Sequence, residues 1–247
     1  MVKSKGKTIL VTGISRGLGL DTTKELLDSG YNVVGISRTY NDEFKDYPSF
    51  SWLKYNLSDS QKMERFLKDN LGNELAFDGY VNNAAWAYDD IITNMNMNEL
   101  KHMYDINVFS PIAITKFCLR NMLLHKTKGS IVHLSSISVH TGYNGLSMYA
   151  STKGALEAFS KNTAREWGRK GIRSNCIVAG FMETEMSKTL SDEQRDRIYK
   201  RTSLKKPTDT KSVASTIEFL LSDKSNSITG QESRYGCFCI KKITFLQ

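Results

Sequence analysis

Prolines, histidines and long apolar runs are all scarce in this chain. Its 247 residues include three prolines and four histidines. No apolar stretch approaches the length of about 20 residues that a membrane-spanning helix needs. No linker or low-complexity tract divides the chain, so we expect one α/β domain over residues 1–247. The histidines are scattered, so the sequence predicts no metal site. Because no long apolar run is present, the sequence also predicts no membrane partner.

Cysteine is scarce as well, which bears on the compartment. The four cysteines show no metal-ligand spacing, and we interpret them as reduced thiols of a cytoplasmic protein: Cys118, Cys176, Cys237 and Cys239. Residues 1–7 are basic, but the apolar run that follows them is short and ends at Thr12. This pattern is typical of a first strand and not of a secretory signal.

Positive charge exceeds negative charge, with 34 Lys and Arg against 26 Asp and Glu and a formal net charge of +8. The basic residues are spread along the chain. No recognition motif and no basic stripe with interleaved aromatic residues accompanies them. We therefore predict no nucleic-acid partner and attribute the charge to solvated faces and an anionic cofactor.

Apolar strands and amphipathic helices alternate along the chain. Strands are expected at residues 7–12, 31–37, 50–55, 78–81, 129–134 and 172–178. Helices are expected at residues 17–29, 59–71, 97–123, 147–169 and 209–222. This alternation predicts a Rossmann-like α/β fold, in which a doubly wound parallel sheet is flanked by helices on both faces.

A glycine-rich turn follows the first expected strand. Gly13 permits a tight turn, Gly17 lets the backbone approach a pyrophosphate, and Gly19 allows close packing of helix on strand. The phosphates would lie at the amino end of the next helix, where free N–H groups and the helix dipole favour anions. A glycine-rich turn is by itself a common structural device. Strand, glycines and helix in this order nevertheless predict a dinucleotide site.

A second group of residues indicates proton-transfer chemistry. Tyr149 and Lys153 are four residues apart, so a helix presents them on one side, and an adjacent cation lowers the pKa of a tyrosine. Ser136 ends an apolar run, and ligands bind at the carboxyl ends of strands in open α/β sheets. Ser135 is the competing serine, but alternation along the strand directs it to the other face. An exposed helix can also carry the Tyr-x3-Lys spacing as a solvated pair.

Taken together, these motifs resemble those of a short-chain dehydrogenase/reductase of the compact type, over almost the whole chain. The family's Thr-Gly-x3-Gly-x-Gly pattern begins at Thr12, and its Asn-Asn-Ala-Gly motif ends here in Ala85. Its Pro-Gly-x3-Thr motif has Ala179 in place of proline and ends at Thr184. The family's catalytic tetrad is matched in order and spacing by Asn107, Ser136, Tyr149 and Lys153. Within the family, the chain most resembles 3-oxoacyl-acyl-carrier-protein reductases and related sugar or polyol dehydrogenases.

The resemblance implies a role for each member of the tetrad. Tyr149 would donate a proton to the carbonyl oxygen of the substrate as hydride leaves the nicotinamide, and Ser136 would hydrogen-bond the same oxygen. Lys153 would lower the pKa of Tyr149 and hold the nicotinamide ribose. Asn107 would hold a water that connects Lys153 to solvent. The alternative for Asn107 is an amide that satisfies backbone groups at a helix kink.

The resemblance also implies which residues contact the cofactor. Arg38 stands at the end of the second strand, where NAD-specific sites usually offer Asp or Glu, and Arg16 lies in the glycine turn. Guanidinium groups suit a 2′-phosphate, so NADP(H) is favoured over NAD(H), with ordinary surface arginines as the alternative. The expected cofactor-binding residues are Gly13, Ile14, Ser15, Arg16, Leu18, Arg38, Asn56, Leu57, Asn83, Ala84, Tyr149, Lys153, Met182 and Thr184.

Several segments depart from the family pattern or set its specificity. Ala85 adds a methyl group beside the cofactor, and Asn56-Leu57 replaces the usual Asp-Val near the adenine. Residues 181–206 correspond to the family's mobile lid over the substrate. The segment 232–247 is atypical because it lacks the family's final glycines, although a strand could still form over 237–240. In the family, this segment helps to assemble tetramers. The resemblance therefore implies a homo-oligomer, either a tetramer or a dimer.

Three functions remain open from the sequence. The first is an NADP(H)-dependent carbonyl reductase or alcohol dehydrogenase, acting on a 3-oxoacyl thioester or on a small molecule such as a sugar or polyol. The second is a dinucleotide-binding pseudoenzyme or sensor, against which the intact tetrad argues. The third is an epimerase or dehydratase of the extended branch, which needs a longer C-terminal domain.

An acidic acyl-carrier protein is a candidate partner of the first of these functions. Such a partner requires cations beside the active-site mouth. The candidate docking residues are Lys126, Lys128, Arg169 and Lys170. Cations near helix carboxyl ends are also explained by the helix dipole alone.

Overall fold

Seven parallel strands form the centre of the molecule, in the order β3-β2-β1-β4-β5-β6-β7. The computed structural model describes residues 6–184 and 191–236. The order changes direction between β1 and β4, which is the switch point at which open α/β sheets bind ligands. The strands are β1 Thr8–Thr12, β2 Asn32–Ser37, β3 Phe50–Lys54, β4 Gly79–Asn82, β5 Ser130–Ser136, β6 Arg173–Ala179 and β7 Glu232–Arg234.

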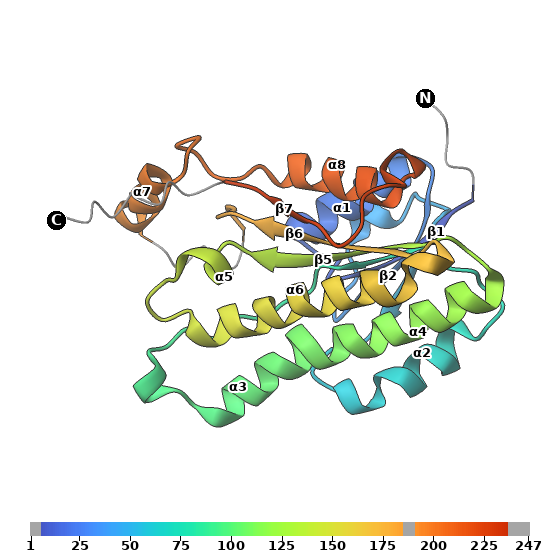
Figure 1. Cartoon of the computed structure of the whole chain (residues 1–247), viewed down its shortest axis with the longest axis horizontal. Coiled ribbons are helices and arrows are strands. Elements are labelled where there is room, and N and C mark those ends of the chain that lie inside the picture. Colours follow the sequence, from blue (N-terminus) through green and yellow to red (C-terminus); the bar gives the residue numbers. More distant parts are fainter. Residues whose placement is uncertain (1–5, 185–190, 237–247) are drawn as a thin grey trace.

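Helices cover both faces of this sheet (Figure 1). Helices α1 and α8 pack together on one face, and α2, α4 and α6 lie on the other. The α-helices are α1 Gly17–Asp28, α2 Met63–Leu71, α3 Met97–Tyr104, α4 Ser110–His125, α5 Ser138–Thr141, α6 Ser147–Trp167, α7 Asp192–Arg201 and α8 Thr210–Leu221. Short helices are η1 Asp42–Phe44, η2 Ser60–Lys62, η3 Ile92–Asn94, η4 Asp105–Phe109, η5 Gly168–Lys170 and η7 Asp223–Ser225.

The strands are apolar throughout because both sides of the sheet are covered. Ile9 and Val11 of β1 belong to the core cluster that includes α1 and α8 residues, whereas Leu10 between them joins the cluster on the α2 and α4 side. All three side chains are fully buried. This alternation fixes the register of the strand. The predicted Rossmann-like doubly wound sheet is confirmed.

The structure differs from the expected elements in a few places. The helix expected at 97–123 is divided into α3, the π-helix η4 and α4, with Asn107 at the centre of η4. Helices α5 and α7 were not among those expected from the sequence. The strand considered at 237–240 lies outside the described residues, and β7 is formed earlier, by 232–234. None of the described helices is long and apolar enough to span a bilayer.

Candidate active site

The turn between β1 and α1 requires glycine at two positions. Gly13 has a φ of +75°, and a Cβ at this position would lie 2.8 Å from the Cα of Ala84. A Cβ on Gly19 would lie 2.0 Å from the carbonyl oxygen of Gly13, so α1 approaches the end of β1 too closely for any side chain. The amide of Asn83 holds this turn by donating to the carbonyls of Thr12 and Gly13, each at 3.1 Å.

The amino end of α1 is suited to an anionic group. Its N-cap residue Arg16 makes no side-chain capping hydrogen bond, and the first turn contains no acidic residue. The first N–H groups of α1 therefore lack a side-chain cap, and together with the helix dipole they favour phosphate. This helix end and the glycine turn fit a dinucleotide pyrophosphate.

Two arginines lie on adjoining loops at this edge of the sheet. Arg16 and Arg38 are both exposed, and neither guanidinium group forms a hydrogen bond or ion pair with any other residue of 6–184 or 191–236. Arg38 directly follows β2. The side chain of Asn41 donates to the carbonyl of Ser15 at 2.9 Å, which joins the loop after β2 to the glycine turn. Both guanidinium groups are thus available to one ligand.

Tyr149 and Lys153 share one side of α6, as expected from their spacing. The Nζ atom of Lys153 lies 5.6 Å from the centroid of the Tyr149 ring. The ammonium is buried and donates to the carbonyl of Leu134 at 2.7 Å. Burial lowers the pKa of Lys153 to about 8, because the charged form loses its hydration.

The pKa of Tyr149 is raised above its usual value near 10, mainly by burial and further by the carboxylate of Asp89. Lys153 is not among the causes of this shift, so the expected lowering of the Tyr149 pKa by Lys153 stays a prediction. The Lys153 ammonium is directed at the Leu134 carbonyl and lies against the face of the ring. The largest cause of the raised Tyr149 pKa is desolvation of the phenol, and the negative charge of Asp89 adds to it.

The two serines at the end of β5 face opposite sides, as alternation predicts. Ser135 is buried and donates to Oε1 of Glu157 on α6 at 2.5 Å. Ser136 is the last residue of the strand, at its carboxyl end. Its Oγ accepts hydrogen bonds from the N–H and the hydroxyl of Ser138, at 3.2 and 3.0 Å. The hydroxyl hydrogen of Ser136 therefore remains available for a substrate oxygen.

Asn107 is almost fully buried, and its side-chain amide is fully engaged by protein groups. Its Oδ1 accepts from the N–H of Trp86 at 2.9 Å, and its Nδ2 donates to the Trp86 carbonyl at 2.8 Å and to the Thr152 hydroxyl at 3.1 Å. This is the alternative that the sequence left open, an amide that satisfies backbone groups at a helix kink. The contact with Thr152 places Asn107 next to Lys153. A water relay through Asn107 therefore has to use its main-chain carbonyl.

The other expected cofactor residues differ in what they can offer. Ile14 and Leu18 are buried in the core, so only their backbone groups can reach a ligand. Thr184 approaches the glycine turn, where a Cβ on Gly17 would lie 3.5 Å from its Cγ2. Asn56 is exposed, whereas the side chain of the neighbouring Leu57 is buried. Met182 is partly buried against the core.

Asp89 is a site residue that sequence reasoning missed. It is exposed, lies in the loop after β4, and raises the pKa of Tyr149. The N–H of the next residue, Asp90, donates to the carbonyl of Gly145 at 3.0 Å. This contact fastens the loop to the segment just before α6, where Tyr149 lies. The sequence offered no signal beyond two acidic residues after the Asn-Asn-Ala-Ala motif.

A second missed group consists of His140, Glu157 and Glu232, whose possible metal-ligand atoms all lie within 4.8 Å of one another. The histidines are scattered in sequence, so this contact between α5, α6 and β7 could not be foreseen. Its charges already have partners: Lys161 and Arg234 form ion pairs with Glu232, at 2.5 and 3.4 Å. A further cation would have to displace them. Both ring nitrogens of His140 face this group, so its ring belongs here and not to the substrate pocket.

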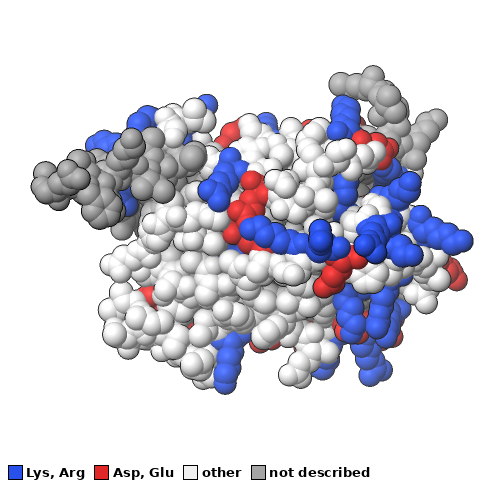
Figure 2. Space-filling view, in the orientation of Figure 1, with Lys and Arg blue, Asp and Glu red and all other residues white. Residues whose placement is uncertain are grey.

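The four candidate docking cations lie at the amino ends of the strands, whereas Ser136 lies at the carboxyl ends. Lys126 is the C-cap of α4, and a Cβ on Gly171 would lie 2.9 Å from Cγ of Lys128, so the two pairs of cations adjoin. The seven residues of β5 separate this edge from Ser136 by about 20 Å. Figure 2 shows the Lys and Arg side chains gathered where α4 and α6 end, while the opposite ends of α3 and α6 are mostly uncharged. The expectation that these cations flank the mouth within one chain is wrong.

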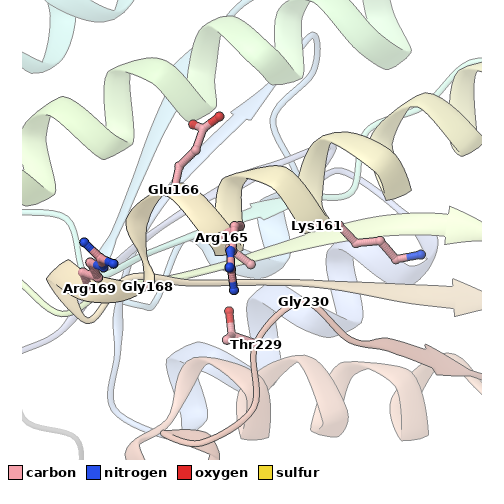
Figure 3. A pocket seen from close by; sticks show the side chains of 8 residues that line it. Lys161, Arg165, Glu166, Gly168, Arg169, Thr229 and Gly230 are labelled. Atoms are coloured by element: carbon pink, nitrogen blue, oxygen red, sulfur yellow. The ribbon is translucent and has the colours of Figure 1, made fainter.

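A surface hollow of about 650 Å³ lies near this basic edge (Figure 3). It opens between the last turns of α6 and the Thr229–Gly230 segment, and three basic residues line it: Lys161, Arg165 and Arg169. Gly230 N–H donates to the carbonyl of Ser174, near the amino end of β6. The hollow is therefore separate from the edge that carries the tetrad.

Known proteins resemble this chain in sequence over most of its length. A family model described as enoyl-(acyl carrier protein) reductase matches residues 13–235. The 3-oxoacyl-[acyl-carrier-protein] reductase of Salmonella typhimurium is 32% identical over 231 residues, which cover 92% of this chain and 94% of that protein. The reductase of the same name from Vibrio cholerae is 30% identical over 231 residues, with the same coverage.

Solved structures share the fold. ElxO with NADP bound is 27% identical, with a TM-score of 0.84 over 92% of this chain and 96% of that one. A 4-hydroxyisoleucine dehydrogenase complexed with NADH superposes with a TM-score of 0.89 at 24% identity, over 96% of this chain and 100% of that one. The chain belongs to the short-chain dehydrogenase/reductase family and is an NAD(P)-dependent oxidoreductase.

Proposed function

We propose that this protein is an NADP(H)-dependent reductase that interconverts a carbonyl and a secondary alcohol, with a 3-oxoacyl thioester as the first candidate substrate. The observation that carries the NADP(H) preference is the pair of exposed arginines, Arg16 and Arg38, on adjoining loops, whose guanidinium groups have no partner in the described part of the chain. Guanidinium groups bind a phosphate through paired hydrogen bonds. The relatives named as 3-oxoacyl-[acyl-carrier-protein] reductases support the thioester.

The proposed chemistry assigns the proton to Tyr149. A bound nicotinamide supplies hydride to the carbonyl carbon. Because burial and Asp89 raise the pKa of Tyr149, its phenol stays protonated at neutral pH and can act as a general acid toward the carbonyl oxygen. The free hydroxyl hydrogen of Ser136 stabilises the charge that develops on the same oxygen. Lys153, with a pKa of about 8, is charged at neutral pH and is well placed to return a proton.

The cofactor would be held by the residues expected from the sequence. The glycine turn and the amino end of α1 would take the pyrophosphate. Arg16 and Arg38 would take the 2′-phosphate, and Lys153 the nicotinamide ribose. The segment 181–206, which contains α7, would act as the lid, and a hydrogen bond from Tyr199 of α7 to Glu183, at 2.5 Å, joins two parts of this segment.

A homo-oligomer of this chain is part of the proposal. Phe109, which directly precedes α4, and Leu124, near the end of α4, are 52% and 59% exposed, and a second copy packed along this helix would cover both. Docking of an acyl-carrier protein would need such an assembly, since only a second copy could bring its basic edge to the mouth. We also place the protein in the cytoplasm, where the free thiols of Cys118 and Cys176 would stay reduced.

A screen of NADPH oxidation across acyl thioesters, keto-sugars and diketones tests the function. We expect turnover of a 3-oxoacyl thioester, faster on a carrier protein than on a small thiol. The carrier advantage should fade with salt and disappear when Lys126, Lys128, Arg169 and Lys170 become alanine. Equal rates with the carrier-protein thioester and the small thioester would contradict the docking proposal. Turnover of no carbonyl by a protein that binds NADPH would favour the pseudoenzyme.

A specific observation favours a sugar or polyol as the second candidate substrate. The exposed carboxylate of Asp89, close enough to Tyr149 to raise its pKa, has no hydrogen-bond partner among the described residues. A carboxylate accepts hydrogen bonds from hydroxyl groups and repels an anionic carrier. Turnover of a keto-sugar but not of either thioester would establish this candidate.

A further inference from the structure

A single buried carboxylate contacts the chain on both sides of Ser136. Glu157 lies on α6, one turn after Lys153, and is 6% exposed. Its Oε1 accepts a hydrogen bond from the hydroxyl of Ser135 at 2.5 Å and faces Nε2 of His140 at 3.1 Å. Both contacts use the same oxygen atom.

The two partners of Glu157 belong to segments that position Ser136. Ser135 is the preceding residue in β5. His140 lies in α5, and Ser138 of the same helix donates two hydrogen bonds to Oγ of Ser136. Glu157 therefore fastens the end of β5 and the start of α5 to the helix that carries Tyr149 and Lys153.

The charged residues around Glu157 determine which ring nitrogen of His140 carries the hydrogen that Glu157 accepts. Arg234 of β7 approaches Nδ1 of His140 at 3.4 Å, so Nδ1 acts as the acceptor and Nε2 carries the hydrogen that points to Glu157. Arg234 also pairs with Glu232, as does Lys161. With these two cations in place, the cluster is better explained as a clamp than as a metal centre.

A buried carboxylate without hydrogen-bond partners destabilises the folded state. The hydrogen bonds from Ser135 and His140 therefore hold the Glu157 carboxylate in one position. From this geometry we propose that Glu157 is a positioning residue, which aligns the Ser136 hydroxyl with the Tyr149 phenol by clamping β5 and α5 to α6. The kinetic part of its test rests on the proposed carbonyl reduction. The structural part does not.

Two substitutions at one position separate the clamp from the charge. Glu157→Met keeps the length of the side chain and removes the acceptor. Glu157→Gln keeps one oxygen, which is sufficient because both contacts use Oε1. The control is Glu166→Met, which changes an exposed glutamate nine residues later on the same helix. Ser135→Ala removes one contact alone and serves if Glu157→Met does not fold.

The kinetic readout is kcat for the carbonyl substrate, with the Kd for NADPH measured separately by fluorescence. Displacing a catalytic group by about 1 Å can reduce the rate as much as 100-fold. We expect kcat to fall at least about tenfold in Glu157→Met and severalfold in Ser135→Ala, with the Kd for NADPH unchanged. Glu157→Gln and Glu166→Met should stay within about threefold of the original protein.

The structural readout is amide hydrogen exchange over residues 136–141, which needs no substrate. The clamp predicts faster exchange in this segment for Glu157→Met and unchanged exchange for Glu157→Gln. Failure to find any reducible substrate would overturn the proposed function but leave this readout informative. Unchanged exchange in Glu157→Met, or full kcat in a folded Glu157→Met protein, would overturn the clamp. A loss of kcat accompanied by equal losses of NADPH binding and thermal stability would also overturn it, as general unfolding.

Discussion

The ammonium of Lys153 donates a 2.7 Å hydrogen bond to the carbonyl of Leu134, two residues before Ser136 on β5. This contact ties the proposed proton-transfer helix directly to the strand that carries the serine. It also holds a cation inside the molecule, since Lys153 is 2% exposed. Burial lowers the pKa of Lys153 from 10.5 to about 8, so the charged side chain destabilises the fold at neutral pH.

Lys153→Met should therefore stabilise the protein while abolishing its activity. A fall in pKa from 10.5 to about 8 corresponds to about 3 kcal/mol, which is an upper bound on the gain below pH 8. Between pH 8 and 10.5 the unfolded state binds more protons than the native state, so the original protein gains stability as the pH rises. The difference between the two proteins in free energy of unfolding should shrink over this range. Chemical denaturation without cofactor, repeated across these pH values, measures it.

An unchanged or lower free energy of unfolding for Lys153→Met at pH 7 would contradict the buried charge. The same variant should bind NADPH more weakly, because the proposed contact with the ribose is lost. These two outcomes have opposite signs and are measured separately.

Asp89→Asn should lower the pH at which carbonyl reduction fails on the alkaline side. The Asp89 carboxylate disfavours the charged form of Tyr149, so its removal lets the phenol ionise at a lower pH. Because Asp89 is exposed, the displacement should be a fraction of a pH unit and should diminish at high salt. The pH profile of kcat/KM reports it.

Asp90→Asn is the matched control for this prediction. Its carboxylate accepts hydrogen bonds from the Tyr88 hydroxyl and the Ile91 N–H and is not a cause of the raised Tyr149 pKa. A profile that does not move in Asp89→Asn, or that moves equally in both variants, would argue against a direct effect of Asp89 on the phenol.

The fold and the residues of the site were largely predictable from the sequence, because both are encoded in local patterns. The glycine turn is fixed by neighbours such as Gly13 and Gly19, and the shared side of Tyr149 and Lys153 follows from helix geometry. The opposite directions of Ser135 and Ser136 follow from strand alternation. Each of these inferences uses residues close together in the chain.

Relationships between distant segments could not be predicted in the same way. The charge acting on Tyr149 comes from Asp89, and the clamp on Ser135 joins α6 to α5 and β7. Desolvation, which raises the pKa of Tyr149, depends on burial and not on sequence spacing.

Arg38→Asp should narrow or reverse the preference for NADPH over NADH. A hydrogen bond to a charged group contributes about 1.5–3 kcal/mol, so the ratio of the two dissociation constants should change by at least about tenfold. Arg120→Asp, which changes an exposed arginine on α4, should leave the ratio unaltered. Equal affinities for both cofactors in the unmodified protein would contradict the preference itself.

The central claim, that Tyr149 donates the proton to the substrate oxygen, is tested most directly by Tyr149→Phe. Tyr47→Phe is the control, since its hydroxyl donates to Asp28 and belongs to a different part of the fold. The decisive measurement is the single-turnover rate of carbonyl reduction with NADPH, alongside the Kd for NADPH. We predict that Tyr149→Phe binds NADPH with unchanged affinity and reduces the carbonyl at least about 100-fold more slowly, while Tyr47→Phe matches the original protein. A Tyr149→Phe protein that retains most of its rate would contradict the assignment and require another proton donor.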